Sequence, residues 1–543
     1  MNRYNYTRRP TTETKVGQLV IGGENPIRIQ SMTNTSTMDT EGSADQAFRI
    51  AEAGGEIVRL TTQGTREAEN MREVRKELDK KGCRVPLVAD VHFNPAAAFK
   101  AVETCEKVRI NPGNFVDPAR TFRKLDFSDQ EYTDELKKIE ETFIPFLEKC
   151  KEFGTALRLG VNHGSLSDRI MSRYGDTPEG MVESALEYLR ICRQQDFENV
   201  VISIKSSNVG VMVKTVELLA KRMEEEDMHF PLHLGVTEAG DAEDGRVKSA
   251  VGIGTLLGEG LGDTIRVSLT EDPENEIPVA RKLRDYVMSR KGHDPVIDPE
   301  VNRENRVTAS PIPGFENVRH PLVMGVDLEK IPENWHRAIA EKEIPVFNDN
   351  LPVVLETSNG NIPGAMASWL ERFTASGASN PVLLKVRYED KDLENLQIKA
   401  SADLGPLLLW GYGQGIWIDA PAFSKEEINS LSLGILQAAR LRISKTEYIA
   451  CPSCGRTLFD LQKTLKEVKE ATKEMKGLKI GVMGCIVNGP GEMADADYGY
   501  VGAGPGRISL YKGKQLVKRN ILSEDAIPEL LNLIKSDINP FDI

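Results

Sequence analysis

Ala156-Leu157-Arg158-Leu159-Gly160-Val161-Asn162-His163 is one of eight short β-rich runs in the first 290 residues of the chain. Each run ends in polar or glycine residues. A stretch with apolar residues three and four positions apart, the spacing of an amphipathic helix, then follows it. The other runs are Pro26–Thr33, Glu56–Thr61, Val85–Phe93, Lys107–Asn114, Val200–Ser206, Pro231–Glu238 and Thr264–Thr270. Strands that alternate with helices form parallel βαβ units, and eight such units predict a (β/α)8 TIM barrel.

An open, doubly wound sheet is the alternative to a barrel. It would place a glycine-rich fingerprint directly after the first strand. In this chain Gly22-Gly23 precedes the first run, and Gly252-x-Gly254-x-x-x-Gly258 comes too late and has the wrong spacing. We interpret the later glycines as a site of helix packing, and the barrel is the favoured fold.

Buried basic residues recur along the predicted strands. Four runs carry an arginine between apolar neighbours and a fifth carries a lysine: Arg59, Arg109, Arg158, Arg266 and Lys205. In a barrel, the carboxyl ends of the strands form the active site. A buried guanidinium is costly unless an anion neutralises it, and arginine pairs well with phosphate. Asp90 and Glu238 are the acids in comparable places, so a phosphate or diphosphate ligand is favoured over structural ion pairs.

Other polar side chains at the strand ends complete the predicted site. Asp90 and Glu238 are candidates for proton transfer or for binding hydroxyl groups. The remaining candidates for substrate binding are Asn162, Ser268, His92 and His163. A histidine at the end of a strand also often serves as a hydrogen-bonded packing residue, and that interpretation stays open for both histidines.

Three cysteines near the C-terminus indicate an inorganic centre. Cys451-Pro452-Ser453-Cys454 is followed by Gly484-Cys485-Ile486-Val487-Asn488-Gly489-Pro490-Gly491-Glu492. Structural zinc needs four closed ligands, and this region offers no fourth Cys or His. Three thiolates can instead hold three irons of a cubane iron–sulfur cluster, leaving the fourth iron open or bound by a harder ligand. Glu492 is the first candidate for that oxygen donor, ahead of Asp495 and Asp497. Zinc and a thioredoxin-like Cys-x-x-Cys are the alternatives.

Composition narrows the class of protein. The chain has 543 residues and a formal net charge of −13, so a broad nucleic-acid-binding surface is not expected. No apolar run reaches membrane-spanning length, and no targeting leader is recognised. Seven scattered cysteines do not indicate a disulfide framework, and an oxidising compartment would threaten a cluster. We expect a cytoplasmic protein.

The chain divides into three predicted domains. Residues 1–290 form the barrel, residues 291–433 a middle α/β insert and residues 434–543 a small α+β cluster domain. Within the insert, the predicted β-runs are Pro321–Val326, Pro352–Thr357, Pro381–Val386 and Pro406–Ile418. The insert has no cysteine and no row of buried arginines, so we interpret it as a spacer or docking module.

Six motifs resemble those of one family. They are Pro26–Thr33 (PIRIQSMT), Val108–Asn114 (VRINPGN), Leu159–Ser165 (LGVNHGS), Leu234–Gly240 (LGVTEAG), Ala450–Arg456 (ACPSCGR) and Gly484–Glu492 (GCIVNGPGE). The family is that of the 4-hydroxy-3-methylbut-2-en-1-yl diphosphate synthases, iron–sulfur enzymes of the methylerythritol phosphate pathway of isoprenoid synthesis. About 145 residues separate the two matching regions, which resembles the longer three-domain form of the family.

The resemblance implies roles for particular residues. Cys451, Cys454, Cys485 and Glu492 match the ligands of a [4Fe-4S] cluster. Asp90 and Glu238 match the family's acidic active-site residues. The positions that match the family's diphosphate-binding residues are Arg59, Arg109, Arg158, Asn162, Lys205, Arg266 and Ser268.

The implied reaction is the reductive ring-opening of 2-C-methyl-D-erythritol 2,4-cyclodiphosphate to 4-hydroxy-3-methylbut-2-enyl diphosphate. Two electrons enter and water leaves, and the unique iron of the cluster would exchange Glu492 for a substrate oxygen. The chain shows no flavin or nicotinamide site, so ferredoxin or flavodoxin is the expected electron donor. A homodimer is expected. The alternatives are an iron–sulfur hydro-lyase that acts on a phosphorylated substrate without net redox change, and a non-enzymatic, zinc-stapled anion-binding protein.

Overall fold

The computed structural model describes residues 2–117, 126–299, 309–486, 489–493 and 495–537. The chain forms two compact units. One comprises Pro10–Gly245, Gly262–Ala280 and Lys445–Ile543, and the other comprises Met1–Arg9, Arg246–Leu261 and Arg281–Ser444. The first unit holds the strands of the barrel together with the C-terminal sheet. The predicted domain boundaries at residues 290 and 433 stay predictions.

The predicted barrel is confirmed. Its parallel strands are β3 (Arg28–Met32), β4 (Ile57–Thr62), β5 (Leu87–Val91), β6 (Lys107–Ile110), β7 (Ala156–Asn162), β8 (Val200–Lys205), β9 (His233–Leu234) and β10 (Thr264–Ile265). They pair in the order β8-β7-β6-β5-β4-β3-β10-β9. A parallel bridge between Ile202 and Leu232 joins β8 to β9, and this contact closes the sheet on itself.

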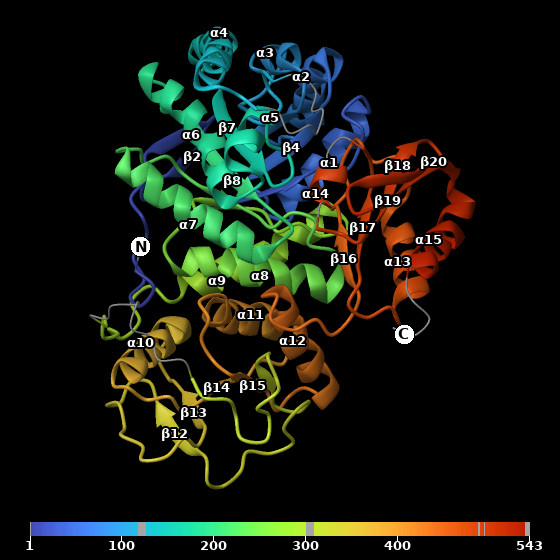
Figure 1. Ribbon diagram of the computed structural model, residues 1–543. Helices are drawn as coiled ribbons and strands as arrows, with labels where there is room; N and C mark the ends of the chain where they lie inside the picture. The colour runs from blue at the N-terminus through green and yellow to red at the C-terminus, as the bar shows by residue number, and fades with distance from the viewer. Residues whose placement is uncertain (1, 118–125, 300–308, 487–488, 494, 538–543) are drawn as a thin grey trace. The chain divides into compact units, whose positions relative to one another are not determined.

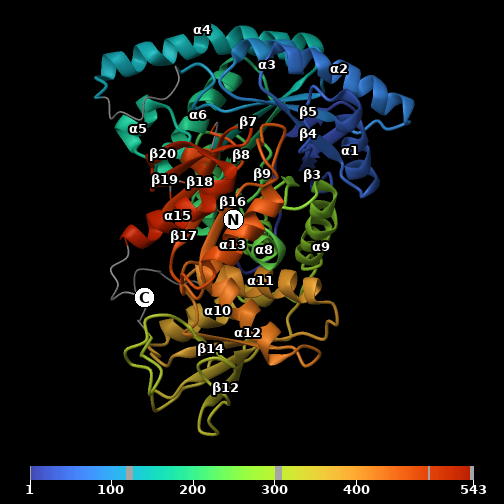
Figure 2. The same cartoon turned by 90° about the vertical axis from the view of Figure 1, so that its right-hand side faces the viewer.

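Helices follow the strands around the barrel. They are α1 (Thr40–Glu52), α2 (Thr65–Lys80), α3 (Pro95–Ala101), α4 (Asp129–Phe153), α5 (Asp168–Tyr174), α6 (Pro178–Gln194), α7 (Val209–Glu225), α8 (Ala242–Gly258) and, after a short 3₁₀ turn (Pro273–Asn275), α9 (Glu276–Met288). The 25-residue α4 runs along the outside of the barrel and packs on α6 (Figure 2).

The last two strands are shorter than the sequence predicts. The runs Pro231–Glu238 and Thr264–Thr270 contribute only two strand residues each. Beyond them the chain stays close to its neighbours, since the Arg266 amide donates to the Leu234 carbonyl (2.9 Å). It leaves the regular ladder because its polar residues turn into the mouth of the barrel.

A hairpin closes the amino end of the barrel. Strands β1 (Glu13–Val16) and β2 (Leu19–Gly22) pair antiparallel. Their side chains Val16 and Ile21 are fully buried against Ile57, Val88, Ala156 and Val201, which lie at or near the amino ends of the barrel strands. This apolar plug leaves the carboxyl end as the open mouth, where active sites of such barrels lie.

The middle α/β sheet is also confirmed. All five of its strands are parallel and lie in the order β11-β15-β14-β13-β12. The strands are β11 (Leu322–Val323), β12 (His336–Ile339), β13 (Val353–Glu356), β14 (Val382–Arg387) and β15 (Gly415–Asp419). The helices are α10 (Ile362–Ala375), α11 (Leu393–Leu409) and α12 (Lys425–Ala438).

One predicted β-run in this region is wrong. Pro406–Ile418 is strand only from Gly415, and its first part belongs to α11. The residues of α11 from Leu396 to Leu408 are almost all buried, so its sequence lacks the polar face that marks a surface helix. Strand β12 was not predicted. Its residues His336–Ile339 lie at the edge of the sheet and are only partly buried, so they give no apolar signal.

The glycine stretch in α8 is a packing site, as predicted. A Cβ atom on Gly254 would lie 3.0 Å from the Cβ of Ala402 in α11. One on Gly405 would lie 2.9 Å from a methyl group of Val251 in α8. Small residues therefore allow α8 and α11 to cross closely, and a nucleotide-binding role for these glycines is not needed.

The C-terminal domain is a mixed sheet with helices, in agreement with the predicted α+β class. Its strands, in the order of the sheet, are β16 (Glu447–Ala450), β17 (Lys479–Met483), β18 (Tyr498–Gly504), β19 (Arg507–Lys512) and β20 (Gln515–Leu522). Helices α13 (Leu461–Thr472) and α15 (Ser523–Asp537) pack on one face and bury an apolar cluster there (Figure 1). The opposite face carries the short helix α14 (Gly489–Glu492) and a second apolar cluster.

Within the described residues, none of the helices is both long enough and apolar enough to cross a membrane.

Candidate active site

The mouth of the barrel and the cysteine loops line one cavity. Both belong to the same compact unit. The predicted site residues that line this cavity are Arg59, Asp90, His92, Arg109, Arg158, Asn162, Lys205, Glu238, Arg266, Ser268, Cys451, Cys454 and Cys485. The parallel register explains the convergence on the barrel side, because the carboxyl ends of all eight strands meet at one rim.

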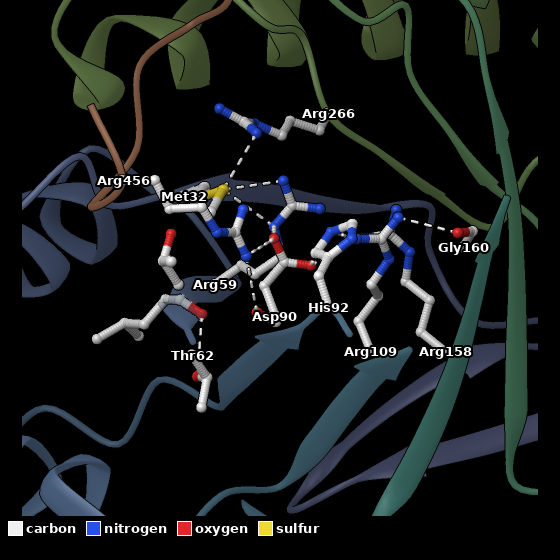
Figure 3. A network of polar contacts seen from close by, with 12 residues as sticks. Met32, Arg59, Thr62, Asp90, His92, Arg109, Arg158, Gly160, Arg266 and Arg456 are labelled. Carbon is white, nitrogen blue, oxygen red and sulfur yellow. Dashed lines mark hydrogen bonds and ion pairs between the residues drawn. The ribbon is translucent and has the colours of Figure 1, made fainter. Parts of the chain in front are cut away.

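Arg109 is the most thoroughly held of the cations. Asp90, Arg109 and Arg158 are register partners across β5, β6 and β7, so their side chains enter the barrel together. Arg109 donates to the Asp90 carboxylate (2.9 Å) and contacts the His92 ring. Its other terminal nitrogen donates to the Gly160 carbonyl (2.9 Å) and to the Asn162 side chain (3.1 Å), as Figure 3 shows in part. Its orientation is therefore fixed before any ligand binds.

Arg266 is also neutralised within the protein. It donates to both carboxylate oxygens of Glu276, at 3.0 and 2.9 Å. Glu276 lies at the start of α9 and was not predicted from the sequence, because the pair exists only once β10 and α9 pack together. Arg266 therefore forms a structural ion pair, the alternative to a phosphate ligand that the sequence analysis considered.

Arg59 lies beside the Met32 sulfur, with two nitrogen–sulfur distances of 3.1 and 2.9 Å. Its closest carboxylate contact is a longer one, 3.9 Å to Asp90 (Figure 3). Burial lowers the pKa of Arg59 to about 10, although Asp90 acts in the opposite direction. A guanidinium with so weak a counter-charge gains most from an added anion.

Arg158 and Lys205 form no ion pair among the described residues, although Glu238 lies near enough to Lys205 to act toward raising its pKa. Arg158 is fully buried and donates to the Ser203 hydroxyl at 3.0 and 2.8 Å, while its third nitrogen, Nη1, has no partner in the described structure. Lys205 is 5% exposed and forms no ion pair with a carboxylate among the described residues. Burial, together with Arg59 and Arg158, holds the pKa of Lys205 well below its usual value.

The sequence analysis missed one cation of the cavity. Arg456, from the cysteine loop, donates to the Asp90 backbone carbonyl (3.2 Å) and lies 3.7 Å from the Asp90 carboxylate. Among the described lining residues there are thus six cations, namely Arg59, Arg109, Arg158, Lys205, Arg266 and Arg456, and two carboxylates, Asp90 and Glu238. Arg456 lies two residues after Cys454, and this position is the sequence signal that could have identified it.

Asp90 is ionised in this setting. Burial alone would raise its pKa, but Arg59, Arg109 and Arg456 hold the pKa of Asp90 well below the usual range of a carboxyl group. His92 is neutral, because burial and the adjacent Arg109 hold its pKa well below the ordinary histidine value. Neither group therefore carries a readily donated proton near neutral pH.

Glu238 is held in a strained backbone conformation. Its φ of 49° lies in the left-handed region, which is uncommon for a residue other than glycine. The next residue, Ala239, forms a parallel bridge with Ala450, directly before the first cysteine. The Thr270 hydroxyl also donates to the Cys451 carbonyl (3.1 Å). The loop that carries Glu238 is thereby joined to the loop that carries the cysteines.

The left-handed backbone conformation of Glu238 is also informative, because backbone strain is common at functional sites.

The donor set of the cysteine loops fits a multi-iron cluster. Cys451, Cys454 and Cys485 all line the cavity, and none of them forms a disulfide. The Gly484 amide donates to the Cys451 sulfur (3.4 Å), a contact that stabilises a thiolate ligand. Within the described residues, no three Cys, His, Asp or Glu side chains converge closely enough to share a single metal ion. Cluster ligands do not need to converge in this way, because each binds a separate iron.

The loop after β7 lies directly against α14. A Cβ on Gly164 would lie 2.1 Å from the Gly491 carbonyl oxygen, and one on Gly491 would lie 2.5 Å from the Gly164 carbonyl oxygen. Only glycines permit this backbone contact. This contact holds Gly491, the residue before Glu492, against the barrel loop that follows β7.

Two predicted residues are not placed in the cavity. His163 is not among its described lining residues, and its ring lies 3.7 Å from Asp176. Glu492 ends α14, but its side chain lies outside the part of the chain that the structure describes, so its role as a ligand stays a prediction.

Comparison with known proteins agrees with this architecture. Residues 11–281 match the model of the GcpE TIM-barrel domain, and residues 447–536 match that of the GcpE protein C-terminal domain. Three full-length relatives carry the name 4-hydroxy-3-methylbut-2-en-1-yl diphosphate synthase (flavodoxin). That of Parabacteroides distasonis is 49% identical, over 99% of both chains. That of Bacteroides fragilis is 50% identical, over 99% of this chain and 97% of its own. That of Leptospira interrogans is 42% identical, over 98% and 97%.

These relatives also span the middle sheet, which the two domain models leave out, so the longer form inferred from the sequence is confirmed. The chain belongs to the family of 4-hydroxy-3-methylbut-2-en-1-yl diphosphate synthases, oxidoreductases of isoprenoid synthesis.

Proposed function

We propose that this enzyme opens and reduces 2-C-methyl-D-erythritol 2,4-cyclodiphosphate in the cavity between the barrel strands and the cysteine loops. The observation that carries the proposal is the meeting of two features in one cavity. Six cations face two carboxylates there, and three cysteines lie on the other side. The first feature fits a multiply charged anion, and the second fits the iron–sulfur chemistry for which the family is known.

Arg158 and Lys205 are the main diphosphate-binding residues in this proposal. Arg266 and Arg109 already have carboxylate partners at 2.9 Å, whereas Arg158 and Lys205 have none among the described residues. Phosphate oxygens would satisfy the Nη1 of Arg158 and restore the charge of Lys205. Asn162 and Ser268 line the same cavity and can donate hydrogen bonds to the remaining oxygens.

Cys451, Cys454 and Cys485 would hold a [4Fe-4S] cluster, with Glu492 as the expected fourth ligand. When bound, such a cluster supplies single electrons and a Lewis-acidic iron next to the substrate. The protein residues have two further roles, which are to orient the substrate and to position the cysteine loop. The cations orient the diphosphate, and the bridge between Ala239 and Ala450 keeps the cysteine loop in place against the barrel.

Glu238 is the residue we assign to proton delivery. The reaction takes up two electrons, and one hydroxyl group of the substrate leaves as water, so a proton must reach that hydroxyl. Asp90 is ionised and bound by arginines. It therefore orients Arg109 and is a poor donor. Glu238 lines the cavity, and the residue after it bridges to Ala450 beside Cys451, so Glu238 lies where a proton can be delivered next to the cysteine loop.

The electrons come from a separate protein in this proposal. The relatives are named for flavodoxin. We therefore assign flavodoxin as the donor, with ferredoxin as the alternative carrier of the same low-potential electrons.

The proposed function is tested by turnover of the cyclic diphosphate with anaerobically prepared enzyme. We expect the linear diphosphate to form only when reduced flavodoxin or a chemical reductant is present, with two electrons used per product. A hydro-lyase would convert its substrate without a reductant. Reductant-independent turnover, or no binding of the cyclic diphosphate at all, would contradict the proposal.

Replacing Glu238 by glutamine should lower turnover by about 10²–10⁴-fold, the usual contribution of a positioned acid. Iron and sulfide content should stay at the wild-type value, because Glu238 is not a cluster ligand in this account. The matched control is Glu224→Gln, which changes an exposed residue on α7. Steady-state rates and metal analysis of both variants decide the point. An unchanged rate in Glu238→Gln would remove the proton role.

Binding of inorganic pyrophosphate should be coupled to protonation of Lys205. The pKa of Lys205 is lowered in the ligand-free cavity, and an anion beside it favours the charged form. Above that lowered pKa, binding therefore takes up a proton, and affinity falls as the pH rises. Calorimetry in buffers with different ionisation enthalpies measures this uptake. We expect Lys205→Met to take up about one proton fewer than the wild type and the exposed control Lys514→Met to match the wild type. Equal uptake in all three proteins would refute the coupling.

A further inference from the structure

Polar side chains occupy the inside of the barrel between the substrate cavity and the hairpin plug. TIM barrels usually fill this space with branched apolar side chains. Here it holds Gln30 of β3, Lys107 of β6 and His233 of β9, and each is no more than 1% exposed. We call these three residues the inner polar layer. We propose that the inner polar layer binds one small inorganic anion with the size and single charge of a halide.

The register of the strands turns two of these side chains inward. Gln30 is the register partner of Ile57, and Lys107 is the partner of Val88 and Ala156. These three apolar partners belong to the cluster that packs against the hairpin plug inside the barrel. Register partners project from the same face of a sheet. Gln30 and Lys107 therefore face the barrel interior too.

His233 faces the same space from the other side of the barrel. It is the register partner of Thr264, and Thr264 pairs in turn with Arg28, two residues before Gln30 on the same face of β3. Burial lowers the pKa of His233 well below its usual value, and the charge of Lys107 lowers it further. His233 is thus neutral and lies within electrostatic reach of Lys107.

The inner polar layer lies directly under the substrate cavity. Lys107 precedes Arg109 by two residues, and Gln30 precedes Met32 by two, so each pair shares one face of its strand. Arg109 and Met32 line the cavity, whereas no member of the inner polar layer is among its described lining residues. The layer is therefore a separate site from the one assigned to the diphosphate.

The polar atoms of the layer lack partners within the described structure. They are the Nζ of Lys107, the Nε2 of His233, and both the nitrogen and the oxygen of the Gln30 amide. The Nδ1 of His233 lies 3.4 Å from the Thr264 hydroxyl, which can donate to it, and Nε2 then carries the hydrogen. Three of the four unpartnered atoms are thus donors. Buried donors without an acceptor are costly, so this group calls for an acceptor among them.

Charge favours an anion over a water molecule as that acceptor. Burial, together with Arg158 and Arg59, lowers the pKa of Lys107 to about 7, and no carboxylate of the described residues opposes this shift. Water would satisfy the hydrogen bonds and leave the positive potential in place. An anion does both, and it favours the charged form of Lys107. A single negative charge suffices, because Gln30 and His233 are neutral donors.

A halide in this position would act on stability and not on the reaction itself. It would offset the repulsion between Lys107 and Arg158, which lines the cavity directly above. An ion that binds the folded barrel and not the unfolded chain stabilises the fold by mass action. The barrel floor would then be neutralised with or without substrate in the cavity.

Crystals of the anaerobically prepared holoenzyme grown in sodium bromide test the site directly, because bromide scatters X-rays anomalously. We expect an anomalous peak in contact with the Nζ of Lys107 and the Nε2 of His233. A water molecule in that place, without anomalous signal, would overturn the proposal. Direct hydrogen bonds among the three side chains, or bromide bound only in the substrate cavity, would overturn it as well.

Thermal unfolding of the holoenzyme tests the same site in solution. The Tm is compared in sodium chloride and in sodium gluconate at equal ionic strength, with saturating pyrophosphate so that the cations of the substrate cavity are occupied. We expect a higher Tm in chloride for the wild type and for the exposed control Lys514→Met, and no difference for Lys107→Met. Should Lys107→Met fail to fold, Gln30→Leu should show a reduced difference.

Equal Tm values of the wild type in the two salts would overturn the anion site. That result would leave the proposed function standing, because the inner polar layer has no role in turnover in this account. Loss of reductant-dependent turnover in the wild type would instead count against the proposed function and not against the anion site.

Discussion

The central constraint on this molecule is an excess of buried positive charge over buried negative charge at the mouth of the barrel. A cation buried without a counter-ion is costly, so such an arrangement persists where a ligand is to complete it. Arg109 and Arg266 are each neutralised by a carboxylate at 2.9 Å. Arg158 and Lys205 form no ion pair among the described residues, and this difference determines where in the cavity an anionic ligand is needed.

The rest of the structure serves to hold the charges and the cysteines together. The hairpin plug of Val16 and Ile21 closes one end of the barrel and leaves the other open. The contact between Gly164 and Gly491, and the bridge between Ala239 and Ala450, fix the cysteine loops to the open end. A thiolate-bound cluster would be negatively charged, so the same cations that hold a diphosphate also favour a cluster beside it.

Much of the architecture could be predicted from the sequence because parallel strands impose a simple geometry. Arg109 and Arg158 are register partners on neighbouring strands, and Arg59 lies two residues earlier in the register on β4, so their convergence follows from the barrel alone. The six motifs indicated the family of the protein, and full-length relatives confirm this assignment.

The remaining features depend on contacts between elements that are distant in the sequence. The pairing of Arg266 with Glu276 and the approach of Arg456 to Asp90 arise only when separate elements pack together. The segment Pro406–Ile418 was assigned to a strand because a helix buried on all sides has no polar face to reveal its period. His163 could not be placed from the sequence either, because its contact with Asp176 forms only once the chain has folded.

The most direct measurement is a crystal structure of the anaerobically prepared enzyme with the cyclic diphosphate bound. The account predicts phosphate oxygens within hydrogen-bond distance of Arg158 and Lys205, with the carbon ring between these cations and the cysteine loop. Phosphate groups bound elsewhere, with carboxylates or other protein groups neutralising Arg158 and Lys205, would contradict it.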